Sequence, residues 1–185
     1  QILFPDMEAV SLFSTPGRTE VGGNHTDHNA GKVLAAAVDL DVLAVASAVE
    51  GTIELYSEGY PTVVVDPRQL KMDPEERYTS SALVRGICAR FSSLGYRTGG
   101  FRACLMSDVP RGSGLSSSAA YEVMVGTILN HLYNDGQIDP VQIAMVAQYA
   151  ENEYFGKPCG LMDQTTCAVG GFVTIDFKDA GSPVV

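Results

Sequence analysis

The sequence predicts an α+β fold, because strand-like runs lead and helix-like runs follow along the chain. Apolar residues make up 45% of its 185 residues, and the mean hydropathy is +0.08. This composition allows a packed core and argues against disorder. A chain of this length forms one domain or a large piece of one.

Six runs of the sequence are typical of strands, since they are rich in valine or alternate in polarity. They are residues 11–14, 33–38, 42–49, 52–57, 62–66 and 100–106. Residues 17–31, between the first two runs, are polar and glycine-rich without a clear period, so we expect a long loop there. Long loops in compact domains are often functional.

Three helices are expected, over residues 80–94, 118–133 and 140 to about 155. Gly95 stands where the C-cap of the first helix belongs. Asp139 and Pro140 form a typical N-cap and first-position pair for the third helix. Residues 167–169 and 172–177 are predicted to form a hairpin joined by two glycines.

The formal charge of −10 and a pI of about 4.6 argue against a nucleic-acid partner. An acidic chain can still bind a nucleotide if backbone amides and Mg²⁺ supply the positive field. The apolar run over residues 33–49 is interrupted by Asp39 and Asp41, so no membrane span is expected.

The four cysteines form no CxxC pair, and we interpret them as free thiols in a reducing cytosol. We therefore expect a cytoplasmic protein. The chain begins at Gln1 without a methionine and ends on a strand-like run, so we expect a fragment of a longer protein.

PRGSGLSSSAA, residues 110–120, places two glycines and three serines directly before a helix. Gly112 and Gly114 let backbone amides converge, and the serines add hydroxyl and N–H groups at the positive end of the helix dipole. This pattern favours a cradle for phosphate. It is not a Walker A loop, because no Gly-Lys-Ser/Thr follows. The alternative is a turn with a serine cap, for which one serine is enough.

GRTEVGGNHTDHNAG, residues 17–31, is rich in glycine and in hydrogen-bonding side chains. A metal site with His25, Asp27 and His28 as ligands is one interpretation, but the spacing matches no recognised zinc pattern. Recognition of a polyol fits better, because sugar hydroxyls bind paired polar groups. A solvated surface loop is the third possibility, which the cost of ordering these glycines weakens.

AENEYFGKPCGLMDQ, residues 150–164, places two carboxylates on either side of a helix break. Glu151 lies near the end of a predicted helix, and Asp163 lies where a new turn or helix could start. Such a pair could hold Mg²⁺ and orient a hydroxyl nucleophile. Taken singly, Glu151 is a solvated helix residue and Asp163 an N-cap.

These three stretches, in this order, resemble the GHMP small-molecule kinases and, within them, the galactokinases. PGRTEVGGNHTDHNAG is similar to the galactokinase signature, PRGSGLSSSAA to the superfamily's ATP phosphate loop, and PCGLMDQ to the galactokinase stretch that holds the catalytic aspartate. The resemblance covers nearly the whole chain. It implies a GHMP kinase N-terminal domain over residues 1–185, ribosomal protein S5 domain 2-like, with a mixed or antiparallel sheet packed against helices.

The resemblance also implies a role for each matching residue. Asp163 would be the catalytic aspartate near the sugar's anomeric hydroxyl, and Arg18 would be its partner, stabilising charge on the transferring phosphoryl group. Ser118 and Glu151 would coordinate Mg²⁺. The residues that would bind the sugar are Asn24, His25, Asp27 and Gly160. Those that would wrap the triphosphate of ATP are Gly112, Ser113, Gly114, Leu115, Ser116, Ser117 and Ser118.

The implied activity is in-line transfer of the γ-phosphoryl group of ATP to the 1-hydroxyl of galactose. The family's third, glycine-rich motif belongs to a C-terminal half that lies outside these residues. Because the active site of such kinases lies between the two halves, we expect the C-terminal domain to complete the site. The fragment alone is not expected to be a competent kinase.

Two positions depart from the galactokinase pattern. Asn24 stands where galactokinases commonly carry glutamate, which leaves the contact to the sugar's 6-position open. Glu20 stands where many members have asparagine. In addition, the chain has no tryptophan, so an aromatic contact to adenine must come from tyrosine or phenylalanine.

Three rival interpretations follow from the same residues. The chain could come from another GHMP sugar kinase, such as an N-acetylgalactosamine or arabinose-type kinase, or from a sensor that binds galactose and ATP without turnover. The intact serine loop, with Arg18 and Asp163 present, favours an active enzyme. An α+β domain without catalytic function would require three motif matches by chance.

Overall fold

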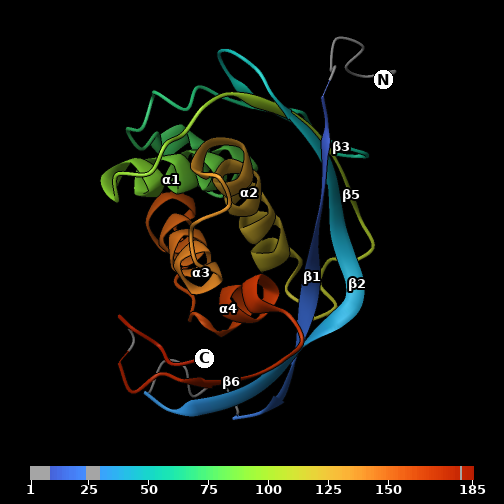
Figure 1. The fold of residues 1–185 in the computed structure, drawn as a ribbon, viewed down its shortest axis with the longest axis vertical. Helices are drawn as coiled ribbons and strands as arrows, with labels where there is room; N and C mark the ends of the chain where they lie inside the picture. Colours follow the sequence, from blue (N-terminus) through green and yellow to red (C-terminus); the bar gives the residue numbers. More distant parts are fainter. Residues whose placement is uncertain (1–8, 24–29, 180) are drawn as a thin grey trace.

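The computed structural model describes residues 9–23, 30–179 and 181–185. It shows a strongly curved sheet with a group of helices packed inside the curve (Figure 1). The predicted α+β class is confirmed. The sheet is mixed, because β3 and β5 run parallel whereas the other strand pairs are antiparallel.

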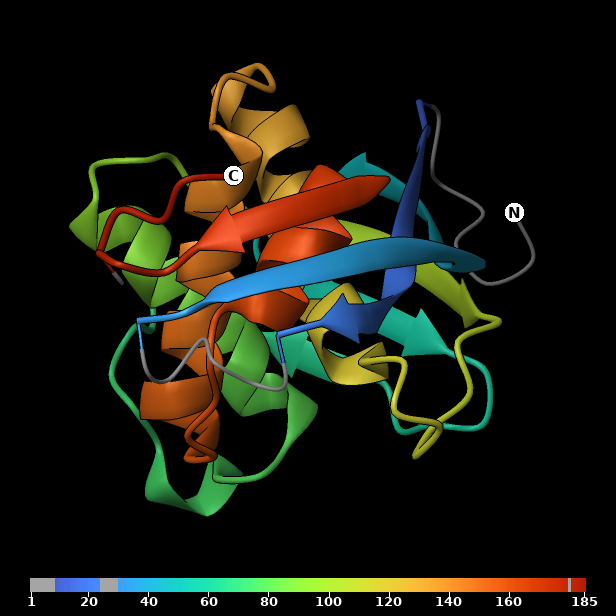
Figure 2. The ribbon, with the colours of Figure 1, turned by 90° about the horizontal axis from the view of Figure 1, so that it is seen from below.

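The described part of the chain forms one six-stranded sheet. The strands lie in the order β1-β2-β5-β3-β4, and β6 pairs with β2. Their bounds are β1 (Ser11–Gly22), β2 (Lys32–Ala48), β3 (Ile53–Ser57), β4 (Val63–Val65), β5 (Phe101–Ser107) and β6 (Phe172–Asp176). Figure 2 shows β6 alongside the first part of β2.

β2 is one strand of 17 residues, so the prediction of two strands over this stretch was wrong. Its first part, residues 32–36, pairs with β6, and its last part, residues 42–48, pairs with β5. Asp39 and Asp41 lie between these two parts, where β2 changes its partner. The strand tolerates both carboxylates there, and Asp41 accepts a hydrogen bond from the Ser14 hydroxyl of β1.

β1 extends to Gly22, so the prediction of a loop over residues 17–31 was wrong for its first six positions. Arg18, Thr19 and Glu20 pair with β2, and the register shifts between Pro16 and Arg18 and again between Glu20 and Gly22. A register shift in a strand interrupts the alternation of its two faces. Residues 17–22 lack a regular alternation of polar and apolar side chains because their strand is irregular, and this lack of a period led to the prediction of a loop.

The three predicted helices agree with the observed ones to within about two residues, whereas α4 was not predicted as a helix. Thr79 caps α1 and Asp139 caps α3, each by accepting a backbone N–H from the first turn. The predicted extension of the third helix to Phe155 is helical throughout, although its last six residues are π-helical. The bounds are η2 (Pro74–Glu76), α1 (Ser80–Ser93), α2 (Ser117–Asn134), α3 (Pro140–Tyr149), η3 (Ala150–Phe155) and α4 (Met162–Val169).

The predicted hairpin across Gly170 and Gly171 was wrong. Residues 167–169 end helix α4, and β6 pairs with β2. Gly170, with φ of +76°, ends the helix, and its N–H bonds back to the Thr166 carbonyl. A glycine pair of this kind serves a helix end as well as a hairpin turn.

The hydrophobic core lies between the curved sheet and the helices. Its larger cluster includes Phe101 of β5, Phe91 of α1 and Ile128 of α2, all fully buried. A smaller cluster joins β2, β6 and α4 through residues such as Val33, Ile175 and Met162. This second cluster holds α4 against the sheet. Within the described residues, no helix is both long and apolar enough to span a bilayer.

The close approach of α1 to η3 depends on Gly86. A Cβ atom there would lie 2.9 Å from the Ala150 Cα and 2.9 Å from the Tyr154 Cβ. We expect Gly86→Ala to lower the free energy of unfolding by about 1–3 kcal/mol, despite the better helix propensity of alanine. Urea denaturation measures this change.

Gly126→Ala in α2 is the matched control. Its Cβ would meet only the Ile143 side chain, at 2.9 Å from Cγ2. Because a side chain can rotate away whereas backbone cannot, this variant should lose clearly less stability than Gly86→Ala. Equal losses would contradict a specific backbone contact at Gly86.

Candidate active site

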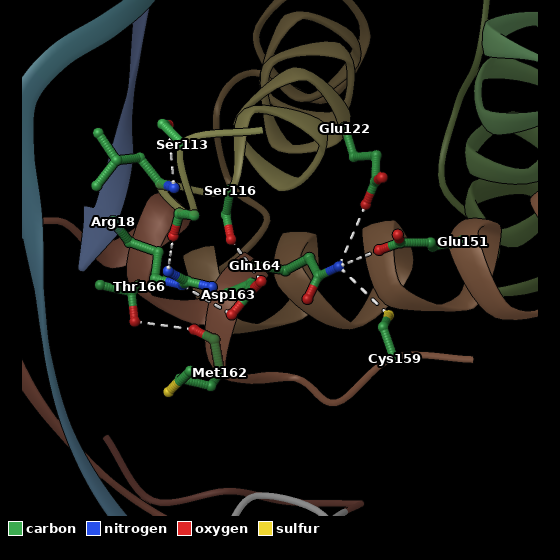
Figure 3. A network of polar contacts seen from close by, with 12 residues as sticks. Arg18, Ser113, Ser116, Glu122, Glu151, Cys159, Met162, Asp163, Gln164 and Thr166 are labelled. Atoms are coloured by element: carbon green, nitrogen blue, oxygen red, sulfur yellow. Dashed lines mark hydrogen bonds and ion pairs between the residues drawn. The ribbon is translucent and has the colours of Figure 1, made fainter. Parts of the chain in front are cut away.

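Asp163 and Arg18 meet at one end of helix α2. Asp163 is the second residue of α4, and Arg18 lies on β1. The Arg18 Nε donates to the Asp163 Oδ1 at 2.8 Å (Figure 3). The arginine side chain is 10% exposed and the aspartate side chain 34%. A buried guanidinium thus holds a carboxylate that still reaches solvent, and that carboxylate can meet a ligand.

The same arginine anchors the glycine loop. Its Nη1 donates to the Gly114 carbonyl at 2.7 Å, and its backbone N–H donates to the Leu115 carbonyl at 3.0 Å. Gly17 allows this approach, because a Cβ atom there would lie 2.9 Å from the Leu115 oxygen. The loop is therefore fixed to β1 directly beside the carboxylate.

The serines of the loop do not cap helix α2. Ser116 is the N-cap residue, but it has φ of +56° and makes no side-chain cap hydrogen bond. Its hydroxyl donates to the Asp163 Oδ2 at 2.5 Å instead. The alternative of a plain serine cap is therefore wrong. The first amides of α2 receive no acceptor from their N-cap side chain, which is the state an anion-binding helix end requires.

Glycine conformations shape the rest of this loop. Gly112 and Gly114 adopt φ of +71° and +79°, which L side chains rarely adopt. The Ser113 hydroxyl donates to the Pro110 carbonyl at 2.7 Å and accepts from the Leu115 N–H at 3.3 Å. Ser118 lies exposed in the first turn of α2. The loop is thus a closed turn that leads into an open helix end.

Glu151 is buried, at 4% exposure, so the interpretation of a solvated helix residue was wrong. Its Oε1 pairs with the Lys157 Nζ at 3.3 Å, and its Oε2 accepts from the Gln164 Nε2 at 2.9 Å. The Glu151 carboxylate raises the pKa of Lys157. The break at residues 156–160 therefore folds back over the carboxylate and carries its counter-charge.

Two polar residues of this region escaped the sequence analysis. Glu122 and Gln164 are buried side by side, and the Gln164 Nε2 donates to the Glu122 Oε2 at 3.3 Å. Burial, with the nearby Glu151 carboxylate, raises the pKa of Glu122 well above its ordinary value. One signal was available in the sequence: Glu122 stands alone among apolar residues of α2.

The sugar-binding residues are placed only in part. Asn24, His25 and Asp27 lie outside the described residues, as does His28 of the alternative metal interpretation. Gly160 lies half-buried in the segment that leads into α4. All four cysteines are free in the structure, as expected. Among the described residues, no group of three or more His, Cys, Asp and Glu side chains is arranged to hold a metal ion.

Two family models match the chain. The GHMP kinases N terminal domain matches residues 82–171, and the galactokinase galactose-binding signature matches residues 4–48. The first match contains the glycine loop, Glu151 and Asp163. The second contains Arg18 and residues 24–29.

Galactokinases are among the similar proteins. One from Pyrococcus furiosus is 36% identical over 166 residues, covering 89% of this chain and 46% of that protein. One from Clostridium tetani is 32% identical over 160 residues, covering 85% of this chain and 40% of that protein. The chain thus spans less than half the length of these curated relatives.

Solved structures share the fold. The structure of Lactococcus lactis galactokinase complexed with galactose matches with a TM-score of 0.87 and 29% identity, covering 99% of this chain and 48% of that chain. Methanococcus jannaschii mevalonate kinase matches with a TM-score of 0.74 and 18% identity, covering 93% of this chain and 55% of that chain. The second likeness concerns the fold alone.

The open helix end gives a stability prediction. Ser117→Ala, in the first turn of α2, should change the free energy of unfolding by less than about 0.5 kcal/mol. Asp139→Ala should cost about 1 kcal/mol, because Asp139 caps α3 by accepting from the Val141 N–H at 2.8 Å. Urea denaturation of the two variants measures the difference. If Ser117→Ala lowers the free energy of unfolding as much as Asp139→Ala does, Ser117 acts as a helix cap and the loop serines serve α2 as ordinary capping residues.

Proposed function

The chain belongs to the GHMP kinases, with a galactokinase galactose-binding signature ahead of the GHMP N-terminal domain, and on this premise we propose that it is the N-terminal part of a galactokinase. The reaction is transfer of the γ-phosphoryl group of ATP to the 1-hydroxyl of galactose. Galactokinase relatives at 31–36% identity support it.

The observation that carries the proposal is the position of Arg18. One guanidinium binds both the Asp163 carboxylate and the Gly114 carbonyl of the glycine loop. A carboxylate for the acceptor hydroxyl therefore lies beside a loop for the phosphates. Phosphoryl transfer needs this proximity, since positioning and electrostatic stabilisation supply most of its rate.

Asp163 and Arg18 are the proposed catalytic residues. The carboxylate lies near the 1-hydroxyl and orients it or accepts its proton as the new P–O bond forms. The guanidinium stabilises the charge on the transferring phosphoryl group and holds the Asp163 carboxylate in place. Ser116, which donates to the other carboxylate oxygen, limits rotation of Asp163.

The ATP phosphates are proposed to lie on residues 112–118. The uncapped N-terminal turn of α2 offers backbone N–H groups and the positive end of the helix dipole. These amides can hold an anion on a chain of net charge −10 without a cluster of lysines. We propose that the loop, bonded to Arg18 on β1, holds the phosphates beside Asp163.

We propose that a magnesium ion accompanies the ATP phosphates, as the family resemblance implies. Mg²⁺ is usually held by one or two carboxylates together with substrate phosphates and waters, and we propose Ser118 and Glu151 as its protein ligands. When bound, the ion neutralises charge on the phosphates. Ser118 is exposed at the start of α2. Glu151 pairs with Lys157, whose long side chain is exposed at the surface.

The sugar is proposed to contact Asn24, His25, Asp27 and Gly160. Asp163 lies three residues beyond Gly160, so this side of the site adjoins the proposed catalytic carboxylate. The C-terminal portion found in the relatives is proposed to complete the site. An N-acetylgalactosamine kinase and a non-catalytic sensor are the alternatives, and the intact Arg18–Asp163 pair favours turnover over sensing.

Asp163→Asn in the full-length protein tests the catalytic role. The amide preserves the shape of the carboxylate but neither its charge nor its basicity. We expect kcat to fall by at least about 100-fold, while ATP affinity measured by calorimetry changes less than about threefold. Coupled release of ADP measures turnover.

Asp135→Asn is the matched control for that variant. Asp135 is exposed at the end of α2, and its side chain pairs with Arg97. Asparagine tolerates its φ of +56°, so activity should be unchanged. Retention of kcat in Asp163→Asn would refute the proposed role of Asp163.

A panel of sugars tests the substrate. We expect kcat/KM to be highest for galactose and at least about tenfold lower for its 6-deoxy form, because a polar site loses a hydrogen bond when the hydroxyl is absent. Equal rates would mean that the 6-hydroxyl is not recognised. A preference for N-acetylgalactosamine would favour the alternative kinase.

A further inference from the structure

Glu122 is a fully buried acid that the proposed reaction leaves without a role. It lies on α2 at 0% exposure. Its Oε2 accepts from the Gln164 amide, whereas its Oε1 has no hydrogen-bond partner among the described residues. Burying a carboxyl group in this way is costly. The presence of a buried carboxyl group at position 122 therefore indicates a specific role for Glu122.

The Gln164 amide is held from two sides. Its Nε2 donates to the Glu151 Oε2 at 2.9 Å and to the Glu122 Oε2 at 3.3 Å. The Cys159 Sγ lies 3.5 Å from the same nitrogen. Turning the amide over would place its oxygen against the Glu151 carboxylate and would remove the donor that the Glu122 Oε2 accepts from, so the observed orientation satisfies both acids.

Side chains of α2 and of its N-cap residue thereby form hydrogen bonds with two consecutive residues of α4. Ser116, at its start, donates to Asp163, and Glu122, further along the helix, accepts from Gln164. Figure 3 shows Asp163 beside Ser116 and the Gln164 amide directed away from it, toward Glu122 and Glu151. The first turn of α4 is thus tied to α2 at two points.

α4 needs such external ties. It has eight residues, and its N-cap residue, Leu161, makes no side-chain cap hydrogen bond. Short helices without caps are marginal by themselves. The side chains of its first turn must therefore be held by their neighbours if Asp163 is to keep its position.

We propose that Glu122 is a positioning residue that, through Gln164, fixes the first turn of α4 and hence the Asp163 carboxylate. The inference rests on the proposed function for its effect on turnover. Glu122 itself touches neither Asp163 nor Arg18 in the described hydrogen bonds, so it acts through its neighbour. What it supplies is a fixed acceptor for the Gln164 amide.

The charges in this cluster define the informative substitution. Among the described residues, Lys157 pairs with Glu151, and Glu122 has no ion-pair partner. Burial favours the neutral form of the Glu122 carboxyl. A glutamine is close in shape to that neutral acid and keeps an acceptor oxygen, whereas methionine keeps the volume and removes the acceptor.

The experiment compares Glu122→Gln, Glu122→Met and Glu122→Leu in the full-length protein. We expect both apolar variants to lower kcat at least about tenfold while the KM values for ATP and galactose change less than about threefold. Glu122→Gln should keep kcat within about threefold of the unchanged protein. Equal loss in Glu122→Gln, with a raised Mg²⁺ requirement, would make Glu122 a metal ligand and overturn the proposal.

Asn130→Ala is the matched control for stability. Asn130 is a second buried polar residue of α2, whose side chain bonds the Ile138 backbone away from the site. It should lower the melting temperature without lowering kcat. If Asn130→Ala lowers kcat as much as the apolar Glu122 variants do, the effect is general destabilisation and the proposal fails.

A spectroscopic readout separates this inference from the proposed activity. The Gln164 side-chain NH₂ signals, identified by their loss in Gln164→Met, should be protected from exchange in the unchanged protein and in Glu122→Gln. They should lose that protection in Glu122→Met. This result is expected even if galactose is not the substrate. Protection that persists in Glu122→Met, or full kcat in that variant, would overturn the positioning role alone.

Discussion

The Arg18 guanidinium is the interaction on which the arrangement of the site depends. It is nearly buried, and it binds a carboxylate from α4 and a carbonyl from the glycine loop at the same time. A buried cation is stable only when its donors are satisfied. The two partners therefore cannot drift apart without leaving the charge unpaired. One side chain on β1 thus sets the distance between two segments that are far apart in sequence.

A second cluster of buried polar side chains fixes the position of α4 relative to the other helices. Glu122, Glu151 and Gln164 are buried where the helices α2, η3 and α4 come together. A buried amide between two acids satisfies one oxygen of each and gives the contact a fixed geometry that apolar packing would lack. Such a network costs stability relative to a hydrophobic core. In return it defines a single position for the start of α4.

Local sequence patterns predicted α1, α2 and α3 well, because apolar spacing, Asp139–Pro140 and Gly95 act within a few residues, but they missed α4. They failed where long-range pairing decided the outcome. The stretch after Pro16 has no period, yet it is a strand because β2 pairs with it across two register shifts. Two strands were predicted on either side of Asp39 and Asp41. β2 instead continues through both aspartates, at the point where its neighbour changes from β6 to β5.

The candidate site was predictable to the extent that its residues stand in motifs. Arg18, Asp163 and the loop serines could be named from the three quoted stretches, and the structure brings Arg18, Asp163 and Ser116 together. The orientation of Ser116 toward Asp163, in place of a helix cap, required coordinates. Glu122 and Gln164 were missed because a single buried contact between two helices leaves no repeat or spacing in the sequence.

The path of β2 has a consequence for how the chain reaches its native state. Residues 32–36 pair with residues 172–176, which lie far away in the sequence and are synthesised after all the other strands of the sheet. Such pairing gives the domain a high contact order, and folds of that kind form slowly. During synthesis the first part of β2 stays without this neighbour until β6 has emerged, exposing an unpaired strand edge that is prone to aggregation. Completing this part of the sheet therefore waits for β6, and α4, which packs between β6 and the other helices, gains its final support at the same moment.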